Sequence, residues 1–159
     1  MSSCYPVNTP MKERAKEWLV PYDKQVDPAD VLLFQQIMGS LNYLAIHTRM
    51  DISFSCGALM RYLHNPSPAH IRGARQILRY LSGTIHFAIK FDKMKGDQFD
   101  LYGYSDANFA NYDKAGFKPH SGWLFFMSSE VISSSSKLQT TVALSSTESE
   151  LYGICMAAR

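Results

Sequence analysis

The chain has few of the features that mark secreted, zinc-binding and membrane proteins. Its three cysteines, Cys4, Cys56 and Cys155, are far apart and have no histidine nearby at ligand spacing, which argues against a disulfide framework and a zinc site. No run approaches the roughly 18 apolar residues of a membrane span, and the charged first twenty residues show no secretory signal. We therefore expect an intracellular protein, cytoplasmic or nuclear, with no membrane partner.

A strong overall charge is also lacking. The formal net charge is +2, so no global field favours a polyanionic partner. Basic residues are nevertheless concentrated in one stretch, where the single acid Asp92 stands among seven of them: Arg61, Arg72, Arg75, Arg79, Lys90, Lys93 and Lys95. This stretch is either a phosphate-facing surface or an ordinary solvated helix face.

At 159 residues and 46% hydrophobic content, the chain is long enough for one ordinary domain or for a helical piece joined to a small α/β piece. Residues 1–26 contain scattered prolines and charges without a sustained period, so we expect an extended lead-in. Residues 27–84 predict a helical segment. Its helices begin after the cap candidates Asp27, Asp51 and Ser67 and end near His47, Asn65 and Gly83.

The third predicted helix has two distinct faces. Its apolar stripe consists of Ile71, Ala74, Ile77, Leu78 and Leu81. Arg72, Arg75 and Arg79 occupy another face, at the i, i+3 and i+7 positions. These three arginines are the candidate nucleic-acid contacts.

From residue 85 the hydrophobic period changes towards two. Strands are predicted at about 99–106, 117–127 and 131–135, which form an antiparallel meander. The run 85–90 is either another hairpin strand or the tail of the helical segment. The fold class is thus α/β, in an α+β arrangement, with residues 85–159 as a separate unit.

The last helix is expected to begin after a cap at Ser145 or Ser146. With Ser145 as the N-cap, Glu148 falls at the third helical position and completes a capping box, which leaves Glu150 free for another role. Asp106 on a strand and a glutamate at a helix start are half of a carboxylate metal site. The ordinary alternative is a surface acid and a helix cap.

Several motifs, in order, resemble one family. They are "FQQIMGSLNYLAIHTRMDISF" (34–54), "RYLHNPSPAHIRGARQILRYLSGT" (61–84), "GYSDANFA" (103–110), "KPHSGWLFF" (118–126) and "ISSSSKLQTTVALSSTESELYG" (132–153). Together they resemble the C-terminal part of a copia-type retrotransposon Pol polyprotein, over about residues 27–159. The resemblance implies the connection segment of the reverse transcriptase, followed by the N-terminal half of a ribonuclease H domain.

The resemblance also implies a site and a substrate. In that family, an aspartate on the first strand and a glutamate at the start of the first helix bind the catalytic metal ions. The resemblance assigns these roles to Asp106 and to Glu150, with Glu148 as the alternative to Glu150. Two Mg²⁺ ions would activate water and stabilise the leaving oxygen during hydrolysis of the RNA strand of an RNA–DNA hybrid. The partners implied are that hybrid, or another nucleic acid, and the remainder of the polyprotein.

Departures from the family pattern lead us to expect an inactive chain. Family nucleases carry two further catalytic acids on a later strand and helix, and the sequence ends at Arg159 without them. We therefore expect a truncated ribonuclease H-like unit whose first strand has an open edge, which favours either aggregation or completion by another chain. A Tyr-x-Asp-Asp polymerase motif is absent from the sequence, which excludes polymerase activity.

Two alternatives remain open. The chain is a non-catalytic nucleic-acid-binding module that uses Arg72, Arg75 and Arg79, or it is a degenerate transposon remnant. Asn108 and Ser134, which replace an acid and a tryptophan of the family pattern, favour the remnant.

Overall fold

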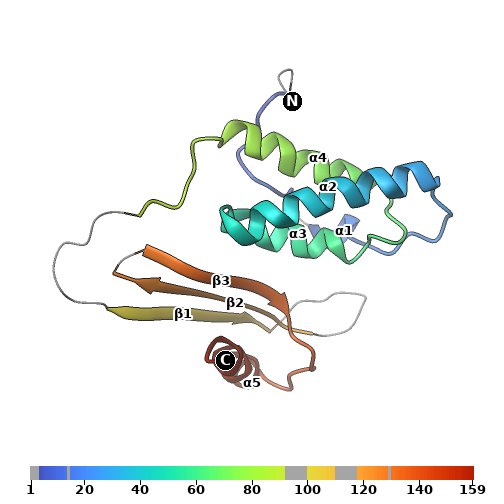
Figure 1. Cartoon of the computed structure of the whole chain (residues 1–159). Helices are drawn as coiled ribbons and strands as arrows, with labels where there is room; N and C mark the ends of the chain where they lie inside the picture. The colour runs from blue at the N-terminus through green and yellow to red at the C-terminus, as the bar shows by residue number, and fades with distance from the viewer. Residues whose placement is uncertain (1–3, 14, 92–99, 110–117, 129) are drawn as a thin grey trace. The chain divides into compact units, whose positions relative to one another are not determined.

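The protein is described by a computed structural model that covers residues 4–13, 15–91, 100–109, 118–128 and 130–159. The described elements are shown in Figure 1 and are, in chain order, α1 (Ala15–Trp18), α2 (Pro28–His47), the 3-10 helix η1 (Met50–Ile52), α3 (Ser53–Met60), α4 (Pro68–Gly83), β1 (Leu101–Asn108), β2 (His120–Met127), β3 (Glu130–Leu138) and α5 (Ser146–Ala157). The chain divides into two compact units, the helical unit Met1–Phe87 and the sheet unit Ala88–Arg159.

The two long helices of the helical unit begin where their capping residues predict. The Asp27 carboxylate accepts a hydrogen bond from the Ala29 N–H at 2.9 Å, and Pro28 occupies the first turn of α2. Ser67 caps α4: its Oγ accepts from the His70 N–H at 3.2 Å, while the Ser67 N–H donates to His70 Nδ1 at 3.0 Å. His70 thus replaces the usual glutamate of a capping box.

A single apolar core holds the helical unit together. Phe34, Met38 and Leu41 of α2 are fully buried, as are Leu59 of α3 and Ile77 of α4. The predicted stripe on α4 faces this core, with Ile71, Ala74, Ile77 and Leu81 all buried. Each such side chain gains about 1.5–3 kcal/mol on burial, so the core is the main source of stability in this unit.

Asp51 was predicted to cap the second helix, and this prediction is wrong. The segment forms η1 and then α3, whose N-cap residue is Ile52. The Asp51 carboxylate accepts two hydrogen bonds from Arg49, at 3.0 and 2.8 Å, and one from the Tyr80 hydroxyl at 2.8 Å. Hydrogen bonds from Arg49, which precedes η1, and from Tyr80 on α4 have therefore replaced the local capping role.

Residues 85–90 form no strand, so the hairpin interpretation of that run is wrong and the segment follows α4 without regular structure. A short helix, α1, lies within the lead-in that was predicted to be extended. No described helix combines the length and the apolarity needed to cross a lipid bilayer.

The sheet unit contains the predicted antiparallel meander, in the order β1-β2-β3. β1 pairs with β2 without interruption from Leu101 opposite Met127 to Asn108 opposite His120. The β2–β3 pairing has one irregularity beside Phe125 and Phe126, where β3 carries an extra residue. Within the described residues, β1 pairs with β2 alone, so its other side is an open edge.

Helix α5 covers one face of this sheet (Figure 1). A Cβ atom at Gly153 would lie 3.3 Å from Ser121 Oγ and 3.6 Å from Ala107 Cβ, so the absence of a side chain allows the close approach of helix and sheet. Gln139 fixes the contact: its Nε2 donates to Ser121 Oγ at 2.7 Å and to the Ser149 carbonyl at 2.9 Å. Small residues and hydrogen bonds therefore position α5.

Candidate nucleic-acid interface and carboxylate pair

Asp106 is exposed near the end of β1. Its neighbour Ala107 is buried and faces Gly153 of α5. Because successive side chains of a strand point to opposite faces, Asp106 lies on the face that α5 does not cover. The same face carries Tyr102 and Tyr104, which contact Phe126 of β2 with ring centroids 5.1 and 6.0 Å apart.

The two glutamates of α5 have different surroundings. Glu148 accepts a hydrogen bond from the Leu144 N–H at 2.6 Å, and its own N–H donates to Ser145 Oγ at 3.1 Å. Ser145 therefore caps the helix as predicted, but the predicted capping box is not formed, because the Glu148 carboxylate accepts from Leu144 and not from the Ser145 N–H. Glu150 is half-buried beside the buried row formed by Ser149 and Gly153.

Asp106 thus lies on the face of β1 that α5 does not cover, whereas Glu150 belongs to α5, the helix that packs on the other face. Among the described residues, no group of three or more His, Cys, Asp and Glu side chains is arranged to hold a metal ion. A two-ion site needs several oxygen ligands around both ions, and the described carboxylates do not supply that set by themselves. Magnesium binding stays a prediction.

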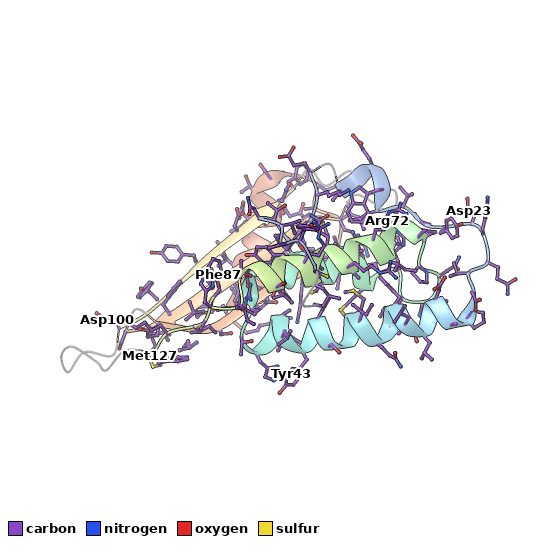
Figure 2. The ribbon with its side chains drawn as sticks, turned by 90° about the horizontal axis from the view of Figure 1, so that it is seen from above. Asp23, Tyr43, Arg72, Phe87, Asp100 and Met127 are labelled. Atoms are coloured by element: carbon purple, nitrogen blue, oxygen red, sulfur yellow. The ribbon has the colours of Figure 1, made fainter. Side chains whose placement is uncertain are left out.

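Arg72, Arg75 and Arg79 lie together on α4, on the side away from its apolar stripe. Arg72 and Arg75 are exposed, and Figure 2 shows Arg72 on this helix. Arg79 is half-buried, and its Nε donates to the Tyr5 carbonyl at 2.7 Å. Lys93 and Lys95, which belong to the same basic stretch of the sequence, lie outside the described residues.

The arginines line a cavity of about 370 Å³ together with residues of the lead-in. Its walls are Lys12, Trp18, Ala69, Arg72, Gly73, Arg75, Gln76 and Arg79. Sequence reasoning missed Lys12 and Trp18 because residues 1–26 show no periodic pattern. A signal was present in Gly73: a Cβ there would lie 2.9 Å from the Trp18 ring, so this helical glycine marks a close approach.

A second polar cluster holds the end of α4 and was also missed. Arg49, 8% exposed, donates to the Thr84 carbonyl at 3.0 Å and to Thr84 Oγ1 at 2.6 Å, besides its two bonds to Asp51. Burial opposes the charge on Asp51, but the hydrogen bonds from Arg49 and Tyr80 and the Arg49 charge outweigh it, so the pKa of Asp51 is lowered. This cluster is structural.

Two features thus define the class of protein: a helical unit with a cationic cavity, and a sheet unit in which one helix covers an antiparallel meander. No protein-family model matches the chain, and no solved structure matches it. Curated sequences do.

The chain is 39% identical over 154 residues to the retrovirus-related Pol polyprotein from transposon RE1 of Arabidopsis thaliana, a match that covers 97% of this chain. It is 36% identical over 158 residues to the corresponding polyprotein from transposon TNT 1-94 of Nicotiana tabacum, with 94% of this chain covered. The chain spans only 10% and 11% of the length of these two relatives. Similarity extends to a shorter protein, the secreted RxLR effector protein 161 of Plasmopara viticola, at 36% identity over 76% of this chain and 82% of that protein.

The chain therefore belongs to the family of retrovirus-related Pol polyproteins from copia-type transposons. This confirms the family that the sequence motifs indicated.

Proposed function

We propose that this chain is the part of a copia-type Pol polyprotein that joins the polymerase to the ribonuclease H-like domain and begins that domain. In this proposal, residues 27–84 are the connection and residues 85–159 the start of the nuclease unit. The main support for this proposal is the order of the elements in the sheet unit. An antiparallel meander with Asp106 on its first strand is followed by one helix that packs on one face of the sheet.

The proposal includes that the chain alone does not hydrolyse RNA–DNA hybrids. Its support is the separation of the two candidate ligands, since Asp106 lies on the open face of β1 while α5, which carries Glu150, packs on the other face. Carboxylates carried on opposite sides of a sheet are expected to be poor joint ligands for two ions that must hold both oxygens of an in-line displacement.

A Mg²⁺ titration monitored by NMR tests whether the two carboxylates bind metal independently of each other. We expect weak, independent responses near Asp106 and Glu150, so that Asp106→Asn leaves the response near Glu150 unchanged. Asp100→Asn, at an exposed position just before β1, controls for the loss of one negative charge. Tight binding that disappears at both positions in Asp106→Asn would show one shared site and contradict the proposal.

The second candidate function is nucleic-acid binding without catalysis. It is favoured by the clustering of Arg72, Arg75 and Arg79 on one side of α4. Binding to an RNA–DNA hybrid should weaken by about 0.9 log units per log unit of salt for each phosphate neutralised. Absent binding, or binding that does not change with salt, would remove this candidate.

A further inference from the structure

The cavity of the helical unit has walls from two parts of the chain. The lead-in contributes Lys12 and Trp18, and α4 contributes Arg72, Arg75 and Arg79. Hydrogen bonds hold the two walls together, because Gln76 Nε2 donates to the Thr9 carbonyl at 3.2 Å and Arg79 Nε donates to the Tyr5 carbonyl at 2.7 Å. The cavity is therefore built before any ligand arrives.

Cationic side chains make up half of the cavity's lining residues, beside apolar ones such as Trp18 and Ala69. Four of the lining residues are Lys or Arg, and none is Asp or Glu. Within the part of the chain that the structure describes, no acidic side chain pairs with Arg72 or Arg75. Four like charges around one space repel one another, and a multiply charged anion would relieve that repulsion.

The shape of the cavity restricts the anion. A volume of about 370 Å³ is at the small end of ligand pockets, which range over about 300–1,000 Å³. Guanidinium groups bind phosphate oxygens through paired hydrogen bonds. A terminal phosphate or a pyrophosphate carries more charge than the single charge of each internucleotide phosphate, and so matches a cluster of cations gathered at one point.

We propose that this cavity binds a phosphate monoester or pyrophosphate group. Lys12 would contact the group from the wall formed by the lead-in, and Arg72, Arg75 and Arg79 from the wall formed by α4. The proposal deepens the nucleic-acid-binding candidate, on which it rests, by naming the group that is bound. The group comes either from a free phosphorylated molecule or from the phosphorylated end of a nucleic-acid strand. In both cases the terminal phosphate is recognised.

Isothermal titration of the full chain with inorganic pyrophosphate tests the site directly. We expect saturable binding of one pyrophosphate per chain, weakened about ten-fold or more by Arg72→Gln and by Arg75→Gln, since each removes charge-assisted hydrogen bonds. Lys12→Gln should weaken it as well, which a site on the face of α4 alone does not predict. Circular dichroism of each variant checks that the helical unit remains folded.

Two control variants remove the same charge elsewhere. Arg159→Gln, at the exposed end of the sheet unit, matches the arginine variants, and Lys24→Gln, exposed in the helical unit, matches Lys12→Gln. Neither should change the affinity. No binding of pyrophosphate, or equal weakening by the control variants, would overturn the proposal.

Competition with oligonucleotides distinguishes the two sources of the phosphate group, a free molecule and a strand end. It also tests the cavity separately from the nucleic-acid-binding candidate on which the proposal rests. If strand ends are recognised, a 5′-phosphorylated oligonucleotide competes with pyrophosphate and its 5′-hydroxyl counterpart does not. If the ligand is a free molecule, pyrophosphate binds and neither oligonucleotide competes. Hybrid binding that rises with strand length while pyrophosphate fails to bind would leave the general nucleic-acid candidate standing and refute the cavity.

Discussion

The two units of this chain are held together by different kinds of contact. Fourteen buried apolar side chains form the core of the helical unit, whereas the buried apolar side chains described in the sheet unit are Ala107, Pro119 and Ala143. The sheet unit buries polar groups in their place, namely Ser121, Gln139 and Ser149. The helical unit therefore relies on the hydrophobic effect, and the sheet unit on close approach and hydrogen bonds.

Large apolar side chains are exposed in both units, and Ile46 of the helical unit is 66% exposed. In the sheet unit, Leu101 is 62% exposed and Tyr104 is 67% exposed, although both lie on a strand. These apolar groups gain little from folding in this unit. The comparison teaches that the sheet unit holds its shape with little apolar burial, so single polar substitutions should matter there and apolar truncations should not.

The largest effect is expected from a matched pair of leucine truncations. Leu59→Ala, at a fully buried position, should lower the free energy of unfolding by about 2–5 kcal/mol. Leu101→Ala, in the sheet unit, should change it by less than about 0.5 kcal/mol because the side chain is mostly in water. Urea unfolding monitored by circular dichroism measures both, and equal losses would remove the contrast between the units.

The ion pair of the helical unit should give the next largest effect. Asp51→Asn leaves the buried Arg49 without its carboxylate and should cost about 2 kcal/mol, less than for a fully buried pair because the Asp51 side chain is 35% exposed. Asp23→Asn, an exposed control, should be neutral.

The same variant has a pH signature. The pKa of Asp51 is lowered in the folded protein, so its stabilising contribution is present above the usual pKa of 3.8 and is lost as the pH falls through the folded value. Acid unfolding of Asp51→Asn should therefore be shallower than that of the wild type. An unchanged acid transition would contradict the assignment.

The polar contact under α5 should follow in size. Gln139→Ala removes the donor that reaches Ser121 and Ser149, and leaves their oxygens buried, at a cost of about 1–2 kcal/mol. Hydrogen exchange should increase in α5 and not in α2. Thr141→Ala, an exposed neighbour, is the control, and equal exchange in the two variants would show that Gln139 does not position the helix.

The smallest effect is a pH dependence at His70. Burial lowers the pKa of this histidine below its usual 6.5, so the unfolded chain takes up the proton first and the helical unit loses stability as the pH falls below about 6.5. His70→Gln keeps a side chain that suits the capping position and should flatten this dependence, at a cost near neutral pH of about 0.5–1 kcal/mol for the lost stacking on Tyr62. Thermal melts between pH 5 and pH 8, a range chosen to span the histidine titration, would reveal the difference. An identical slope in both proteins would exclude His70 as its source.

Much of the fold follows from local signals in the sequence. The caps at Asp27, Ser67 and Ser145 were predictable because each capping side chain bonds to the backbone two or three residues further along the chain. The meander was predictable from alternation and turn residues. The role of Asp51 was not predictable, because the hydrogen bond from Tyr80 on α4 outweighs the capping signal at Asp51, and Tyr80 lies far away in the sequence.

The candidate sites depended on tertiary structure to a greater degree. Alternation places Asp106 and Ala107 on opposite faces of β1, but the sequence does not say which face α5 covers, and that choice separates Asp106 from the face on which α5 packs. The cationic cavity likewise requires the lead-in to pack along α4. Without periodicity in residues 1–26, Lys12 and Trp18 could not be assigned to it.

We have proposed that this chain begins a ribonuclease H-like unit and does not by itself hydrolyse RNA–DNA hybrids. The most direct measurement is incubation of the purified chain with a labelled RNA–DNA hybrid and Mg²⁺, beside Asp106→Asn. We predict that the wild-type chain releases no more RNA fragments than the variant does. Mg²⁺-dependent cleavage by the wild type that is lost in Asp106→Asn would contradict the account.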